Sequence, residues 1–112
     1  MTMLAMVSAR LERAGYDVIT VTRGDDALSR AQELRPRLVV LDVEMPGLDG
    51  LEVTRRLRAD ETMAGLLIVL LTASSGQAEI DAGVAAGADA YVTKPFSPQE
   101  LEARVEQLLG HY

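Results

Sequence analysis

Helical segments alternate with short apolar runs along this chain, and this alternation limits the possible folds more than any other feature. Leu38–Leu41 and Leu66–Leu71 are uninterrupted apolar runs, as expected for parallel strands that are buried on both faces. Ala90–Thr93 is a shorter and mostly apolar run near the end of the chain, and it is predicted to be the last strand. The pattern predicts an α/β fold with a parallel sheet.

Helix signals separate these runs. Ser97 is a typical N-cap, Pro98 suits the first helical position, and Glu100 completes a capping box. Gly83 lies inside another predicted helix, where glycine costs up to about 1 kcal/mol relative to alanine. A further short strand is predicted at Asp17–Val21, which is rich in β-branched residues. The predicted helices are about Thr2–Ala14, Gly24–Leu34, Gly50–Ala59, Gly76–Ala86 and Pro98–Leu109.

Length and composition indicate one small domain over residues 1–112. The net charge of −6 argues against direct binding to nucleic acid, because an acidic surface repels the phosphate backbone. The chain has no cysteine, which is compatible with a reducing cytoplasm. Its apolar start is too short for a membrane span or a signal peptide. We therefore expect a cytoplasmic location.

Three predicted strands end in polar residues whose chemistry is complementary. Asp42, Thr72 and Lys94 each follow one of the three apolar runs, and the carboxyl ends of parallel strands form the ligand crevice of such sheets. A carboxylate there can attack phosphorus and form an aspartyl phosphate. An ammonium group can neutralise phosphoryl oxygens, and a hydroxyl can donate a hydrogen bond to one of them. Each residue alone also has an ordinary structural interpretation, so the prediction depends on their convergence.

The chain resembles the receiver domains of bacterial response regulators, the phosphorylated switches of two-component signalling. The resemblance extends from about Leu4 to Leu109, and it implies a flavodoxin-like, doubly wound parallel sheet. Its motifs here are Leu41-Asp42-Val43-Glu44-Met45-Pro46-Gly47-Leu48-Asp49-Gly50, Leu71-Thr72-Ala73, and Gly87-Ala88-Asp89-Ala90-Tyr91-Val92-Thr93-Lys94-Pro95-Phe96.

The resemblance implies roles for individual residues. Asp42 is expected to be phosphorylated by a partner histidine kinase, and Lys94 to contact the phosphoryl group. Thr72 and Tyr91 match the switch pair, in which the hydroxyl approaches the phosphoryl group and the aromatic ring turns inward. Asp42 and the main-chain carbonyl of Glu44 match Mg2+ ligands. The Glu44 side chain and Ser74 lie where the family tunes the lifetime of the phosphoryl bond.

The sequence departs from the family pattern at its start. The family's first strand, which ends in a pair of acidic residues, is absent before the first predicted helix. In the strand order 2-1-3-4-5, that strand would lie between Asp17–Val21 and Leu38–Leu41. We expect weaker Mg2+ binding, and either rearranged pairing, an edge-to-edge homodimer or reduced stability. Two alternatives stay open: Met3–Val7 serves as the strand, or the chain is part of a longer gene product.

Three functions remain to be distinguished. The first is a phosphorylatable switch with a downstream protein target, which is not itself an enzyme. The second is a degenerate or truncated receiver that dimerises or docks without phosphorylation. The third is a small hydrolase or nucleotide-binding protein, which the absence of a Gly-rich phosphate loop disfavours. His111, the single histidine, lies in the C-terminal tail, where a catalytic base is not expected.

Overall fold

The structure is a computed structural model that describes residues 3–73 and 76–110. Its contacts divide the chain into two compact units. One unit comprises residues 1–20 together with 95–112, and the other comprises residues 21–94. Each unit is described by itself below.

The sheet lies in the unit of residues 21–94 and has three parallel strands within the described part of the chain. These are β1 (Leu38–Asp42), β2 (Leu67–Thr72) and β3 (Ala90–Thr93), arranged in the order β1-β2-β3. All three coincide with predicted strands, to within one residue at the ends. In register, Asp42 lies opposite Leu71, and Leu70 lies opposite Tyr91. Because the strands are parallel, their carboxyl ends all lie at the same end of the sheet.

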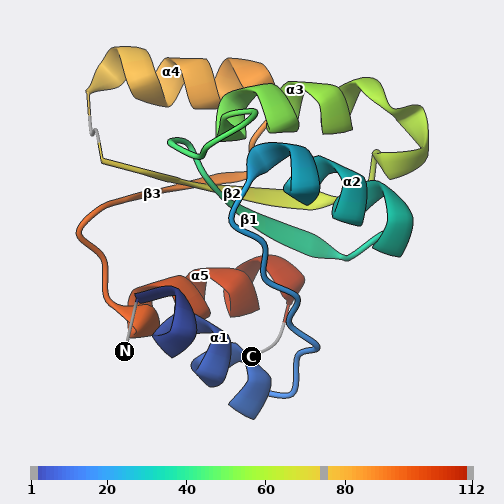
Figure 1. Ribbon diagram of the computed structural model, residues 1–112. Helices are drawn as coiled ribbons and strands as arrows, with labels where there is room; N and C mark the ends of the chain where they lie inside the picture. The colour runs from blue at the N-terminus through green and yellow to red at the C-terminus, as the bar shows by residue number, and fades with distance from the viewer. Residues whose placement is uncertain (1–2, 74–75, 111–112) are drawn as a thin grey trace. The chain divides into compact units, whose positions relative to one another are not determined.

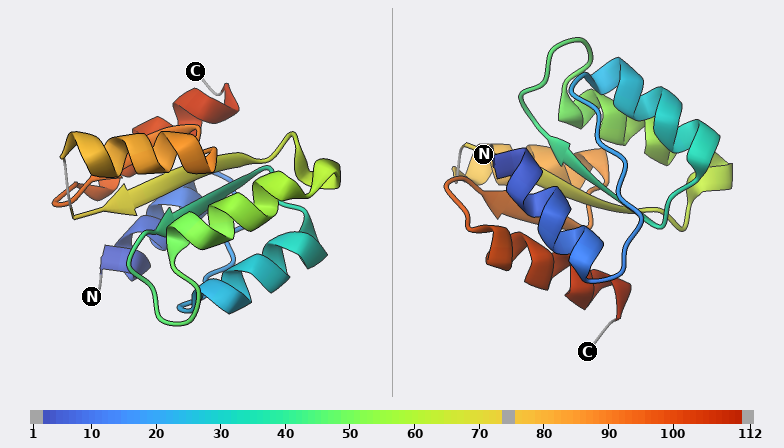
Figure 2. Two further views of the ribbon diagram at one scale, coloured as in Figure 1. Left: turned by 90° about the horizontal axis from the view of Figure 1, so that it is seen from above. Right: turned by 60° about the horizontal axis from the view of Figure 1, so that its bottom comes forward.

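Three helices of this unit lie on one side of the sheet, side by side in the order α2, α3, α4 (Figures 1 and 2). They are α2 (Gly24–Leu34), α3 (Gly50–Ala59) and α4 (Gln77–Ala86), and a 3-10 turn, η1 (Glu61–Met63), follows α3. The core between helices and sheet consists of buried apolar side chains from both layers. Its members are Ala27, Ala31, Leu41, Val53, Leu57, Met63, Leu66, Ile68 and Leu70.

The start of α3 fixes the end of the loop that follows β1. The Asp49 side chain accepts a hydrogen bond from the backbone N–H of Glu52 at 2.8 Å, which makes Asp49 the N-cap of this helix. The backbone N–H of Gly50 donates to the Val43 carbonyl at 3.0 Å. Thus α3 begins directly beside the end of β1.

The unit of residues 1–20 and 95–112 contains two helices that pack against each other, α1 (Met3–Arg13) and α5 (Pro98–Leu109) (Figure 2, right). Arg10 Nε lies 2.7 Å from Glu102 Oε1 across this pair. The Ser97 hydroxyl accepts a hydrogen bond from the Glu100 N–H. The predicted N-cap of this last helix is confirmed.

In the first part of the chain the structure confirms the predicted helix, but it contradicts one alternative and one predicted strand. Met3–Val7 is helical and does not serve as a strand. Asp17–Val21 is not a strand either, and most of its residues are exposed. A strand needs a neighbour to satisfy its backbone hydrogen bonds, and no described segment pairs with this one. The β-branched composition of Asp17–Val21 was therefore not sufficient to make this segment a strand.

Among the described residues, none of the helices is both long and apolar enough to cross a membrane.

Candidate functional site

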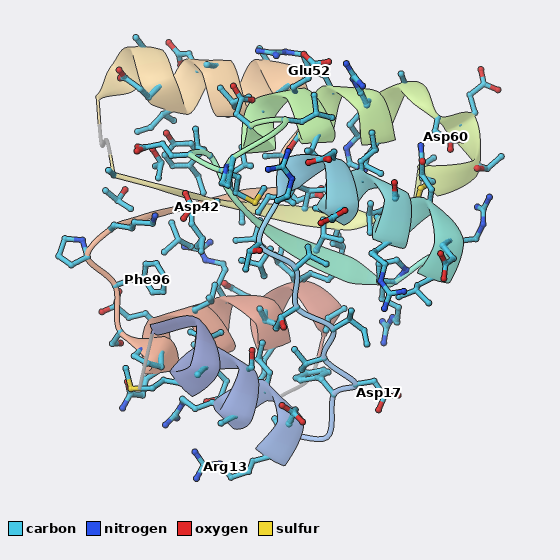
Figure 3. The ribbon with its side chains drawn as sticks, in the orientation of Figure 1. Arg13, Asp17, Asp42, Glu52, Asp60 and Phe96 are labelled. Carbon is cyan, nitrogen blue, oxygen red and sulfur yellow. The ribbon has the colours of Figure 1, made fainter. Side chains whose placement is uncertain are left out.

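The three strand-end residues singled out by the sequence meet at one edge of the sheet. Lys94 follows β3 and Asp42 ends β1, yet Lys94 Nζ lies 2.5 Å from Asp42 Oδ2. Because β2 is the middle strand, the lysine side chain spans the end of β2 to reach the aspartate. Thr72 ends β2, so it lies on the strand between the two. Figure 3 shows Asp42 at this end of the sheet.

Asp42 is held from two sides while its side chain stays accessible. Its Oδ1 atom accepts a hydrogen bond from the Glu44 backbone N–H at 3.0 Å, and its Oδ2 atom faces the Lys94 ammonium group. The Asp42 side chain is 32% exposed and that of Lys94 is 37% exposed. The carboxylate is therefore accessible to a small molecule or to a side chain of another protein.

Thr72 is buried but adjoins both charged residues through the backbone. It is only 3% exposed, and its carbonyl accepts a hydrogen bond from the Lys94 N–H at 2.6 Å. The carbonyl of the residue before it, Leu71, accepts from the Val43 N–H at 2.8 Å. These two bonds extend the ladder past the strands and fix the spacing of Asp42, Thr72 and Lys94.

Gly50 allows α3 to begin close to Asp42, a role that the sequence alone did not indicate. A Cβ atom at Gly50 would lie 2.4 Å from the Asp42 carbonyl oxygen, which is far inside van der Waals contact. The residue must therefore be glycine for α3 to start this close to the end of β1. A glycine at a predicted helix start, eight positions after an aspartate that ends a strand, was the available signal.

Tyr91 does not lie at the edge of the sheet that carries Asp42. It is the second residue of β3, opposite Leu70, and it packs partly buried against the core. Its ring lies against α4 at Gly83. The ring is thus placed between the sheet and a helix, rather than beside the carboxylate.

The described residues fit Mg2+ only in part. They contain no group of three or more aspartate, glutamate, histidine or cysteine side chains that could hold a metal ion. Asp42 supplies a carboxylate, and Glu44 adjoins it through its backbone. Mg2+ is often held by one or two carboxylates, with water and substrate phosphate completing its shell. The residues present can supply that minimum and little more.

Two residues from the sequence analysis lie outside the described part of the chain, namely Ser74 and His111. Ala73, which comes directly after Thr72, is described and exposed.

A second carboxylate–cation pair lies at the opposite end of the sheet, where the strands begin. Nη2 of Arg58, a residue of α3, lies 2.5 Å from Oδ2 of Asp89. Asp89 is the residue directly before β3. The guanidinium group also donates to the carbonyls of Gly87 and Leu66, each at 2.7 Å. Asp89 Oδ2 in turn accepts from the Ile68 N–H at 2.8 Å. This cluster ties α3 to the starts of β2 and β3.

Two carboxylates on α3 and directly after it have lowered pKa values. Hydrogen bonds from the Thr62 hydroxyl and N–H lower the pKa of Asp60. A hydrogen bond from the Arg56 side chain lowers the pKa of Glu52. Figure 3 shows Glu52 on α3 and Asp60 at the end of this helix, both away from Asp42. These shifts reflect local helix-surface pairing rather than site chemistry.

The family model of the response regulator receiver domain matches residues 1–106. The chain belongs to this family. It therefore has the α/β receiver fold of two-component response regulators, with the three parallel strands described above.

Known relatives agree with this assignment. The chain is 44% identical over 108 residues to the alkaline phosphatase synthesis transcriptional regulatory protein PhoP of Bacillus subtilis (strain 168). That match covers 96% of this chain and 44% of PhoP, so the chain spans less than half the length of this relative.

Solved structures show the same fold. The chemotaxis response regulator CheY4 of Vibrio cholerae has a TM-score of 0.86 at 33% identity, covering 93% of this chain and 87% of CheY4. The receiver domain of a sensor histidine kinase of Pseudomonas aeruginosa PAO1 has a TM-score of 0.84 at 32% identity. The match covers 96% of this chain and 88% of the Pseudomonas receiver domain. That structure has a magnesium ion coordinated in the active site cleft.

Proposed function

We propose that Asp42 accepts a phosphoryl group from a phosphohistidine of a partner histidine kinase. The observation that carries the proposal is the contact between Lys94 Nζ and Asp42 Oδ2, 2.5 Å long, with both side chains about one third exposed. An ammonium group on a flexible stem can neutralise a carboxylate at rest and phosphoryl oxygens during transfer. The accessible carboxylate supplies the nucleophile.

The transfer forms one bond and breaks another. An Asp42 carboxylate oxygen attacks phosphorus, and the phosphorus–nitrogen bond to the kinase histidine breaks. The leaving imidazole nitrogen keeps the electron pair of that bond and takes up a proton. Lys94 then faces the phosphoryl oxygens instead of the free carboxylate, and the Thr72 hydroxyl donates a hydrogen bond to one of them.

Mg2+ belongs to this proposal as a weakly bound cofactor. Asp42 and the main-chain carbonyl of Glu44 would hold the ion. When bound, Mg2+ supplies positive charge that offsets the negative charge of the transferred group. Because the described residues contain no group of three or more side chains that could hold a metal ion together, we expect weaker Mg2+ binding than a site with a further carboxylate pair would show.

The proposed output is a change in protein binding rather than turnover of a substrate. Phosphorylation would shift an existing equilibrium between two conformations, with Thr72 and Tyr91 as the switch pair and a downstream protein as the target. Direct nucleic-acid binding is not part of the proposal, because the chain carries a net charge of −6. A cytoplasmic location, where a kinase could reach the site, is part of it.

A docking module that works without phosphorylation is the second candidate function. The absence, within the described residues, of a cluster of three or more potential metal-ligating side chains favours it. The proximity of Asp42 and Lys94 favours the first, because binding alone does not require an accessible carboxylate beside an ammonium group.

Intact mass after incubation with acetyl phosphate and Mg2+ distinguishes the two functions. The proposal predicts one phosphoryl adduct on the wild type and none on Asp42→Ala. Circular dichroism would show that both proteins are folded. A folded wild type without any adduct, with either acetyl phosphate or a phosphorylated kinase domain as donor, would favour the docking module.

A further inference from the structure

Gly83 lies in the middle of α4 and is buried against the ring of Tyr91. A Cβ atom at this position would lie 2.8 Å from Tyr91 Cε2 and 2.9 Å from Tyr91 Cδ2. It would also lie 3.3 Å from Leu70 Cδ1. Real Cβ atoms do not come this close to other atoms, so a side chain at position 83 requires the ring or the helix to move.

The backbone of α4 does not itself need glycine here. Gly83 is absent from the residues with positive φ, and a helix interior favours alanine over glycine. The glycine therefore costs helix stability without serving a turn. The close approach of the Tyr91 ring is the feature that requires it.

The surroundings leave the ring little freedom on this side. Leu70 lies opposite Tyr91 on the neighbouring strand and is fully buried, at 0% exposure. Densely packed cores accommodate one extra methyl group only by shifting side chains from preferred rotamers or by moving backbone. A methyl group at position 83 would act first on the Tyr91 ring, which is only partly buried.

We infer that Gly83 is a positioning residue for Tyr91: its bare backbone is the surface on which the ring rests between α4 and β3. The position of the ring and the position of α4 then depend on each other. If Tyr91 is the switch aromatic, which rests on the proposed function, Gly83 determines how far the ring can turn inward. Gly83→Ala would favour the outward position of the ring.

Fluorine NMR of the protein labelled with 3-fluorotyrosine tests the placement directly. The chain has three tyrosines, Tyr16, Tyr91 and Tyr112, and Tyr91→Phe identifies the Tyr91 resonance. Gly83→Ala should shift that resonance and leave the Tyr16 resonance unchanged. Gly65→Ala is the matched control, because a Cβ at Gly65 has no atom within 4 Å. An unchanged Tyr91 resonance in folded Gly83→Ala would overturn the inference.

Unfolding by urea tests whether the two residues act through each other. Gly83→Ala should lower the urea midpoint when Tyr91 is present, because the ring must leave its place. In the Tyr91→Ala background the same change should raise the midpoint, because the methyl group has room and alanine favours helix. Equal changes in both backgrounds would mean that the ring and position 83 are independent, against the inference.

Acetyl phosphate separates this inference from the proposed function. Wild type that gains the phosphoryl adduct should shift its Tyr91 resonance, and Gly83→Ala carrying the same adduct should shift it less. Equal shifts would overturn the coupling to the switch. If no adduct forms on wild type, the proposed function fails, while the spectra and midpoints of the unphosphorylated variants still decide the role of Gly83.

Discussion

The sheet has a carboxylate–cation pair at each end, and the two pairs differ in how many partners hold them. Asp42–Lys94 and Asp89–Arg58 have the same separation of 2.5 Å and similar partial exposure. Each carboxylate also accepts one backbone N–H, but Arg58 additionally donates to two backbone carbonyls. Lys94 reaches Asp42 with a single point charge on a flexible stem.

This difference separates a structural pair from a pair suited to chemistry. The planar guanidinium group of Arg58 is fixed by several directed hydrogen bonds, so it cannot turn to another group without losing them. The ammonium group of Lys94 can exchange a carboxylate oxygen for a phosphoryl oxygen at little cost. Distance and exposure do not distinguish the two sites, but the number of fixed partners does.

The largest effect is expected for Lys94→Ala. Removing a charge that faces the transferred group should slow adduct formation from acetyl phosphate by about 10²- to 10³-fold. The free energy of unfolding should change by less than about 1 kcal/mol, because partly exposed ion pairs contribute little to stability. Mass spectrometry over time gives the rate, and urea unfolding gives the stability. An unchanged rate of adduct formation would remove the basis for assigning different roles to the two ion pairs.

Arg58→Ala should have the opposite profile. The change leaves the carbonyls of Gly87 and Leu66 and the carboxylate of Asp89 without the guanidinium group, which should cost about 2–3 kcal/mol of stability. Adduct formation by the folded fraction should stay near the wild-type rate. Urea unfolding and the same mass assay are the measurements, and Arg55→Ala, from an exposed pair on the same helix, is the control. A large loss of phosphorylation in folded Arg58→Ala would contradict the comparison.

Asp49→Ala should have a moderate effect close to the candidate site. Asp49 is the N-cap of α3 and accepts the Glu52 N–H, and loss of such a cap costs about 1 kcal/mol. Ser97→Ala removes the equivalent cap of α5 and should cost a similar amount. Adduct formation should change more in Asp49→Ala, because α3 begins beside Asp42. Equal adduct rates in the two variants would show that the cap of α3 does not position the acceptor.

The smallest effect is expected for Thr62→Val. This change acts on Asp60, a carboxylate that belongs to neither of the two ion pairs. The Thr62 hydroxyl is the largest cause of the lowered pKa of Asp60. A lowered folded-state pKa contributes stability above the unfolded pKa, and that stability is lost as the pH falls through the folded pKa. The wild type should therefore be slightly more stable than Thr62→Val at pH 7, and the difference should shrink below about pH 4. Urea midpoints between pH 3 and pH 7 measure it, and a difference that grows in acid would contradict the assignment.

The sequence predicted the three strands and the N-cap of α5, because each depends on local pattern. It also predicted that Asp42 and Lys94 would meet, since parallel strands share one edge. It failed at Asp17–Val21, because strand formation depends on a neighbour that no local pattern can supply. It found neither Arg58 as a multiple hydrogen-bond donor nor the places of Gly50 and Gly83, because these depend on contacts between elements.

Intact mass after acetyl phosphate treatment of Asp42→Asn and Asp89→Asn, under conditions in which both variants are folded, tests the central claim most directly. Both variants replace one carboxylate of a 2.5 Å pair by a neutral amide of the same shape. The account predicts no phosphoryl adduct on Asp42→Asn and a normal adduct on Asp89→Asn. An adduct on Asp42→Asn, or its loss from Asp89→Asn alone, would show that the chemistry does not reside at the Asp42 end of the sheet.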